Sequence, residues 1–259
     1  TGGDIDQTCI LDNFCWPDPV QSKNTPDGDL KMGQLVRTCK GLYDIAKTYG
    51  TPLVSGKDSM KNDFRGRNGK GEPLTISILP TLLVTAMSKG SLTRSQSSSF
   101  KNSGDLIYWI GNRDAGLAAS EYAEHFHIDA KDDYVAPVNL ETNLSVYRKL
   151  KEVMELGLIA SIHDCSDGGV LCALAESCFG EMLGIKIDLP DLSDVTCFAE
   201  GTGQFVISVP EDSAQKFEKL WQGLPFLPLG QVTKESRFIV NQTINENTSA
   251  LLTAWTREL

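Results

Sequence analysis

The sequence predicts an α/β protein built in two parts. Strand-like apolar runs alternate with segments of helical periodicity along most of the 259 residues, which is the pattern of α/β folds. A Ser-rich stretch at residues 91–104 has few large apolar residues and the composition of a linker. We therefore expect one domain over residues 1–90 and a second over residues 105–259.

The first part begins with a strand over residues 8–11, followed by a turn-rich loop. A helix is expected over residues 32–49, where apolar side chains recur at helical spacing and Gly50 and Pro52 end the segment. A short strand should then end at Ser55, and the polar stretch 64–73 reads as a flap. Pro80 should divide the apolar stretch 74–87 into two strand pieces, because proline lacks the N–H that a strand ladder needs.

The second part alternates more regularly. Strands are expected over residues 105–111, 158–164, 184–189, 203–209 and 237–240, and helices over 139–156, 168–179, 213–224 and near the C-terminus.

Composition excludes several classes of protein. With 24 basic and 34 acidic residues the net charge is −10, so nucleic acid and anionic membranes are not expected as partners. The seven cysteines are scattered without a C-x-x-C pair, which disfavours disulfides and structural zinc and suggests a reducing cytoplasm. No apolar run reaches the roughly 18 to 20 residues of a membrane helix. The chain starts without Met, which suggests a fragment or a processed segment.

The stretch "HDCSDGG", residues 163–169, joins a strand to a helix through two glycines. Free N–H groups at a helix N-terminus attract phosphate, and Asp164 at the strand end could bind Mg²⁺. The alternative is a simple helix cap, with Ser166 or Asp167 at the N-cap and no ligand. His163 is interpreted as a structural partner of its own loop.

A second candidate is "SGKDS", residues 55–59, which follows an apolar strand. Lys57 could neutralise a phosphate, Asp58 could take a metal or a hydroxyl, and Ser59 could donate to a phosphate or carboxylate oxygen. The P-loop pattern is absent, and a solvated turn remains an equal alternative.

Asp12 and Asn13 form the third candidate. They follow a strand and precede aromatic residues and prolines, so they could hold a nucleotide or a metal. The alternative is an Asx-type turn with Phe14 and Trp16 packed in the core.

Taken in order, "DNFCWPDP", "GTPLVSGKDSM" and "HDCSDGGVLCALAE" closely resemble the C-terminal half of the synthase portion of the phosphoribosylformylglycinamidine synthase family. The resemblance covers essentially the whole chain. It implies the fold of the aminoimidazole ribonucleotide (AIR) synthase-like superfamily: a partial, β-rich N-terminal domain and a C-terminal α/β domain with a mixed sheet and flanking helices.

The resemblance also implies a reaction. Members of the family are ATP-dependent ligases of purine biosynthesis, in which ATP phosphorylates the amide oxygen of formylglycinamide ribonucleotide and ammonia from glutamine displaces phosphate. The implied cofactors are Mg²⁺ and ATP or ADP. The implied partners are the first half of the synthase and a glutaminase domain or subunit, and the isolated chain is expected to be inactive.

Site residues follow from the matching motifs. The resemblance assigns ATP contacts to five residues: Asp12, Asn13, Gly56, Lys57 and Ser166. It assigns substrate contacts to Asp58 and Ser59 and the metal to Asp164, and it places no catalytic residue here because the family's catalytic histidine lies in the first half. Some members have a metal-binding Asn at position 57, but protonated Lys57 cannot bind a cation, so a phosphate contact is expected there.

Two alternatives remain open for the function. The chain could be a non-catalytic half that holds a structural Mg-ADP, or it could be part of another ATP-using enzyme of the same superfamily.

Overall fold

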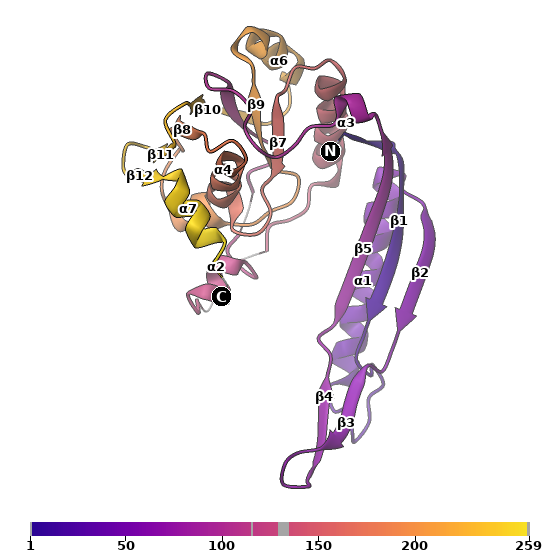
Figure 1. Ribbon diagram of the computed structural model, residues 1–259. Helices are drawn as coiled ribbons and strands as arrows, with labels where there is room; N and C mark the ends of the chain where they lie inside the picture. The colour runs from indigo at the N-terminus through magenta and orange to yellow at the C-terminus, as the bar shows by residue number, and fades with distance from the viewer. Residues whose placement is uncertain (1, 115, 129–134, 258–259) are drawn as a thin grey trace. The chain divides into compact units, whose positions relative to one another are not determined.

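The computed structural model describes residues 2–114, 116–128 and 135–257 (Figure 1). The chain forms two compact units, one over Gly3–Lys89 and one that comprises Gly2 and the described residues from Gly90 onward. Within the described ranges, no helix is both long and apolar enough to cross a membrane.

The N-terminal unit contains a three-stranded sheet, the helix α1 (Gly28–Tyr49) and a two-stranded antiparallel hairpin. The sheet has the order β2–β1–β5, formed by β2 (Leu53–Ser59), β1 (Gly3–Cys15) and β5 (Thr81–Gly90). The hairpin consists of β3 (Asp63–Arg67) and β4 (Pro73–Ser77). Pro80 falls between β4 and β5, so the expected division of this apolar stretch is confirmed.

Strands β1 and β2 are longer than the sequence pattern predicted. β1 continues through Asp12 and Asn13 to Cys15, and β2 continues past Ser55 to Ser59. The two turn interpretations are therefore wrong, although Phe14 and Trp16 are buried as the second of them expected. The physical reason is that β1 and β2 pair in parallel along these residues, which satisfies backbone groups that a turn would leave to water.

Trp16 ties the end of β1 to helix α1. Its side chain is 2% exposed, and its indole N–H donates to the carbonyl oxygen of Lys31 at 3.0 Å. The ring of Phe14 lies beside it, with centroids 6.0 Å apart. The helix ends at Gly50, which adopts the left-handed conformation (φ 69°) and donates its N–H to the Ala46 carbonyl.

The C-terminal unit is built on a seven-stranded sheet of order β12–β11–β8–β10–β6–β9–β7. Only the β11–β8 pair is parallel among the described pairs, so the sheet is mixed, as predicted. The strands are β6 (Leu106–Ile110), β7 (Ser161–Asp164), β8 (Gly184–Ile187), β9 (Phe205–Val209), β10 (Phe226–Thr233), β11 (Arg237–Val240) and β12 (Ile244–Asn247). The helices are α2 (Glu121–His125), α3 (Leu140–Glu155), α4 (Gly169–Phe179), α5 (Asp194–Phe198), α6 (Ala214–Trp221) and α7 (Thr248–Trp255).

Both faces of this sheet carry a hydrophobic core. On β6, Ile107 packs in the core shared with α4, whereas Tyr108 packs in the core shared with α3 and α6. Successive strand residues point to opposite faces, so a strand buried on both sides reads as a continuous apolar run. This explains why β6 and β9 were recognisable from sequence, whereas β10, which contains Pro228 and Gly230, was not predicted.

Candidate functional site

The parallel pairing of β1 and β2 sets six of the eight predicted site residues along two adjacent strands, with Asn13, Lys57 and Ser59 on one face of the sheet and Asp12 and Asp58 on the other. The register sets Asp12 opposite Gly56 and Asn13 opposite Lys57, and Asp58 and Ser59 continue along β2 toward the end of the pair. Because the strands run in parallel, their carboxyl ends meet at the same edge of the sheet, which is where α/β proteins place ligands.

Gly56 lets the Asp12 side chain lie against the backbone of β2. A Cβ atom at position 56 would be 2.5 Å from Asp12 Oδ1, closer than any real contact of that kind. The position therefore requires glycine as long as the Asp12 carboxylate keeps its place. A ligand that approached this edge would meet that carboxylate beside bare backbone.

Lys57 and Asn13 supply the other polar groups at this edge. Lys57 is exposed, and its ammonium donates to the hydroxyl oxygen of Ser59 at 2.8 Å. Asn13 Oδ1 is buried and has no hydrogen-bond partner within the described part of the chain. The ammonium and the hydroxyl can donate to an anionic ligand, whereas the unsatisfied amide oxygen of Asn13 could only accept a hydrogen bond from a ligand donor.

The remaining two predicted residues, Asp164 and Ser166, lie together in the C-terminal unit. Asp164 ends β7 with its side chain 64% exposed, and the Ser166 hydroxyl donates to Asp164 Oδ2. The interaction with the His163 ring, whose Nδ1 lies 3.7 Å from Asp164 Oδ1, lowers the pKa of Asp164 well below its usual range together with the Ser166 hydrogen bond, despite partial burial. Asp164 is thus a carboxylate at neutral pH.

His163 is held from both sides of its ring. Nδ1 lies 2.8 Å from the carbonyl oxygen of Asp164, and Nε2 lies 2.9 Å from Glu176 Oε2 on α4. Both neighbours only accept hydrogen bonds when Glu176 is ionised, so both contacts are hydrogen bonds in the imidazolium form. Consistently, the nearby Asp164 carboxylate raises the pKa of His163, partly offset by burial. His163 therefore fastens its own loop, as its sequence position suggested.

The N-terminus of α4 is not capped as the helix-cap interpretation supposed. The N-cap is Gly168, in the left-handed conformation (φ 76°), and no side chain of Ser166 or Asp167 caps the helix. Instead, Glu200 Oε1 accepts the N–H of Gly168 at 2.9 Å, and the N–H of Gly169 donates to the Ser166 carbonyl. A carboxylate of this chain thus accepts the N–H of the N-cap residue.

Three residues around Asp164 were missed by sequence reasoning. Glu176 and Glu200 hold His163 and Gly168, and the indole N–H of Trp255 on α7 donates to Glu176 Oε1 at 2.8 Å. Glu176 stands on the same helical face as Cys172, one turn after it, which is a weak signal for a residue that faces the loop. Nothing in the sequence pattern indicates Glu200 or Trp255.

The residues around Asp164 suit a magnesium ion that arrives with a nucleotide. No cluster of three or more His, Cys, Asp or Glu side chains able to hold a metal is found within the described ranges. Mg²⁺ commonly uses one or two protein carboxylates together with substrate phosphates, and the ionised, exposed Asp164 fits that mode.

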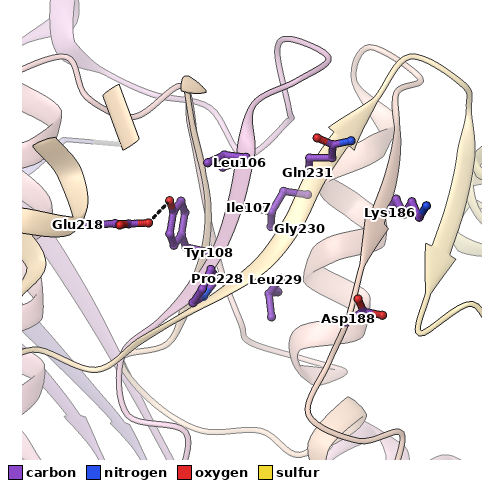
Figure 2. A pocket seen from close by; sticks show the side chains of 10 residues that line it. All are labelled: Leu106, Ile107, Tyr108, Lys186, Asp188, Glu218, Pro228, Leu229, Gly230 and Gln231. Atoms are coloured by element: carbon purple, nitrogen blue, oxygen red, sulfur yellow. Dashed lines mark hydrogen bonds between the residues drawn. The ribbon is translucent and has the colours of Figure 1, made fainter. Parts of the chain in front are cut away.

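A separate hollow of about 510 Å³ lies on the sheet of the C-terminal unit between β6, β8, β10 and α6 (Figure 2). None of the eight predicted residues lines it. At one side, the buried Tyr108 hydroxyl donates to Glu218 Oε1 at 2.8 Å. This contact anchors α6 to the sheet.

Replacing Tyr108 by phenylalanine should lower the free energy of unfolding by about 1 kcal/mol at neutral pH, since one hydrogen bond is lost. Burial and then the bond to Glu218 raise the pKa of Tyr108, so the folded chain holds this proton more tightly than the unfolded chain. The contribution is complete below about pH 10 and is lost as the pH rises further, and this part of the loss should vanish in Tyr108→Phe.

Urea unfolding at neutral and alkaline pH measures this difference. Tyr43→Phe is the matched control, because Tyr43 is 59% exposed. If the free energy of unfolding fell as steeply at alkaline pH in Tyr108→Phe as in the unsubstituted chain, the proposed contribution of the Tyr108 hydroxyl would be contradicted.

Comparison with known proteins places this geometry in a family. The family described as "AIR synthase related protein, C-terminal domain" matches residues 102–242, more than half of the chain. The chain belongs to this family. Among curated proteins, this AIR synthase related chain is 30% identical over 217 residues to phosphoribosylformylglycinamidine synthase subunit PurL of Anaeromyxobacter sp. (strain Fw109-5), covering 78% of the chain and 27% of that protein. It is also 30% identical over 225 residues to PurL of Limosilactobacillus reuteri (strain DSM 20016), covering 86% of the chain and 29% of that protein.

Solved structures show the same fold. Thermotoga maritima PurL complexed with FGAR aligns with a TM-score of 0.62 at 16% identity, covering 96% of this chain and 40% of that one. The same protein complexed with ATP aligns with a TM-score of 0.59 at 16% identity, covering 95% and 38%. PurLQS from Thermotoga maritima aligns with 0.61 at 15% identity, covering 96% and 40%. The AIR synthase-like fold predicted from the motifs is confirmed, and the chain spans less than a third of the curated relatives described above.

Proposed function

We propose that the chain is the C-terminal synthase part of a phosphoribosylformylglycinamidine synthase. The complete enzyme converts formylglycinamide ribonucleotide, ATP and ammonia derived from glutamine into formylglycinamidine ribonucleotide, ADP and phosphate. The observation that carries the proposal is the similarity to PurL proteins over 78% to 86% of this chain. The strand pairing that gathers the motif residues at one edge supports it.

Each cluster has a role in the proposal. At the β1–β2 edge, Asp12, Asn13, Gly56 and Lys57 contact ATP, with the Lys57 ammonium opposite phosphate oxygens, and Asp58 and Ser59 contact formylglycinamide ribonucleotide. Fixed donors and cations at such a site stabilise the charge that develops when a phosphoryl group is transferred.

In the C-terminal unit, the proposal gives Asp164 a Mg²⁺ ion and Ser166 a nucleotide contact. The metal, when bound, would neutralise phosphate charge. The chain's own residues prepare the place for it, because His163 and Ser166 keep the Asp164 carboxylate ionised and oriented.

The proposed partners are the first half of the synthase and a glutaminase domain or subunit. Exposed apolar residues on the outer strands of the N-terminal unit support the proposal that another domain packs against it. Adjacent residues that point to opposite faces are both exposed: Leu53 and Val54 on β2, and Leu83 and Val84 on β5. Apolar side chains grouped in this way usually mark a contact surface. We place the protein in the cytoplasm, in keeping with its free cysteines and its role in purine biosynthesis.

The chain alone is expected to form no formylglycinamidine ribonucleotide from formylglycinamide ribonucleotide, ATP and ammonia, because the proposal places the catalytic histidine in the first half. A longer protein that contains this chain and the first half should form it. Product formation by the chain alone, or its absence from the longer protein with ammonia supplied, would contradict the proposal.

The fate of bound nucleotide separates the active part from a structural half. ATP that exchanges, and whose binding depends on formylglycinamide ribonucleotide, supports a working site. ADP that survives purification and never turns over would instead indicate a permanent structural nucleotide.

A further inference from the structure

A chain of hydrogen bonds connects the C-terminal helix to the strand end that carries Asp164. The indole N–H of Trp255 on α7 donates to Glu176 Oε1 at 2.8 Å. The other oxygen of the same carboxylate, Oε2, lies 2.9 Å from Nε2 of His163. The opposite ring nitrogen of His163 lies 2.8 Å from the carbonyl oxygen of Asp164.

Glu176 is the central member of this chain of contacts. It uses both carboxylate oxygens, one toward each neighbour, and its side chain is only 30% exposed. It stands on α4, whose core face, including Val170, Ala173 and Leu174, is buried against the sheet. A carboxylate on a rigidly packed helix gives the imidazole a fixed point that a loop residue could not provide.

Trp255 strengthens that fixed point. Besides its hydrogen bond, its ring packs on Phe179 at the end of α4, with centroids 5.8 Å apart. The rotamer of Glu176 is therefore held from the C-terminal helix, although Trp255 itself is largely exposed.

We propose that Glu176 is a positioning residue for ligand binding at Asp164. It acts by holding the His163 ring in place, and Trp255 supports Glu176 in this role. The inference rests on the proposed function, in which a metal–nucleotide complex binds at Asp164. Outer carboxylates that orient a metal-binding group commonly change metal affinity by about 10- to 100-fold when they are replaced. Glu176 touches neither substrate nor metal in this proposal.

The test measures binding of MnADP to the chain by titration calorimetry. Glu176→Gln should weaken binding about tenfold, at the lower end of that range, because the amide keeps an acceptor for Trp255 but presents no second acceptor to His163. Trp255→Phe should weaken it less. Glu181→Gln, which makes the same change just beyond α4 on an exposed side chain, should leave it unchanged.

A second measurement does not depend on any ligand. The nitrogen chemical shifts of the His163 ring report whether each ring nitrogen carries a proton, and they should change in Glu176→Gln but not in Glu181→Gln. Glu176→Asp keeps the negative charge on a shorter side chain. It should recover part of the MnADP affinity and part of the His163 ring shifts. Loss of stability alone would not move the ring shifts.

The outcomes are distinguishable. If Asp164→Ala abolishes MnADP binding while Glu176→Gln retains both full affinity and unchanged His163 shifts, the positioning role is overturned and the proposed function stands. If the unsubstituted chain does not bind MnADP, or Asp164→Ala leaves binding unchanged, the ligand site itself is wrong and the positioning role falls with it.

Discussion

Asp164→Ala is expected to weaken the binding of MgADP to the chain by at least about 100-fold, close to 3 kcal/mol. Asp164 is the exposed carboxylate of its cluster, and its pKa is lowered, so it offers a full negative charge at neutral pH. Alanine removes that charge, so the metal–nucleotide complex loses its proposed carboxylate ligand. Titration calorimetry with MgADP measures the change.

Asp167→Ala is the matched control, because Asp167 is exposed in the same loop and its loss alters the net charge equally. It should bind MgADP like the unsubstituted chain. If Asp164→Ala changed neither MgADP affinity nor thermal stability, the loop would only connect β7 to α4 and would hold no ligand.

Where the sequence predicted strands and helices, it placed their order better than their ends, but it did not predict β3, β10, β12 or the short helices α2 and α5. In the C-terminal unit, strands such as β6 and β9 are buried on both faces, so their apolar runs are visible without any knowledge of the fold. In the N-terminal unit the polar ends of β1 and β2 look like turns. Only the pairing of two distant segments, Leu11 to Cys15 with Ser55 to Ser59, makes them strands, and local patterns do not contain that pairing.

The Asp164 cluster shows the same limit. Its motif identifies a strand, two glycines and a helix, all of which the structure has. The partners that determine its chemistry come from elsewhere in the chain: Glu200 precedes β9, and Trp255 ends α7. The sequence motif therefore identified the loop that carries Asp164. The groups that bond the α4 N-terminus and hold His163 depend on tertiary contacts, which the motif does not contain.

Gly56→Val should destabilise the N-terminal unit by no more than about 1 kcal/mol, because Gly56 is exposed and the first atom that a side chain there would meet is the end of the Asp12 side chain. The first added carbon alone would stand 2.5 Å from Asp12 Oδ1. The Asp12 side chain must then rotate away or β1 and β2 must separate, and either movement disrupts the edge where the predicted ATP contacts lie. Urea unfolding measures the stability, and ATP binding measures the effect on the site.

A second substitution distinguishes this steric clash from a general destabilising effect of valine at this position in β2. Asp12→Gly in the Gly56→Val background removes the atoms that clash, so most of the lost stability should return while ATP binding stays weak. Gly69→Val, at a glycine with no atom near its missing Cβ, should cost far less. If Asp12→Gly restored no stability, the two positions would not be coupled, and Gly56 would be required by the backbone alone rather than by the carboxylate beside it.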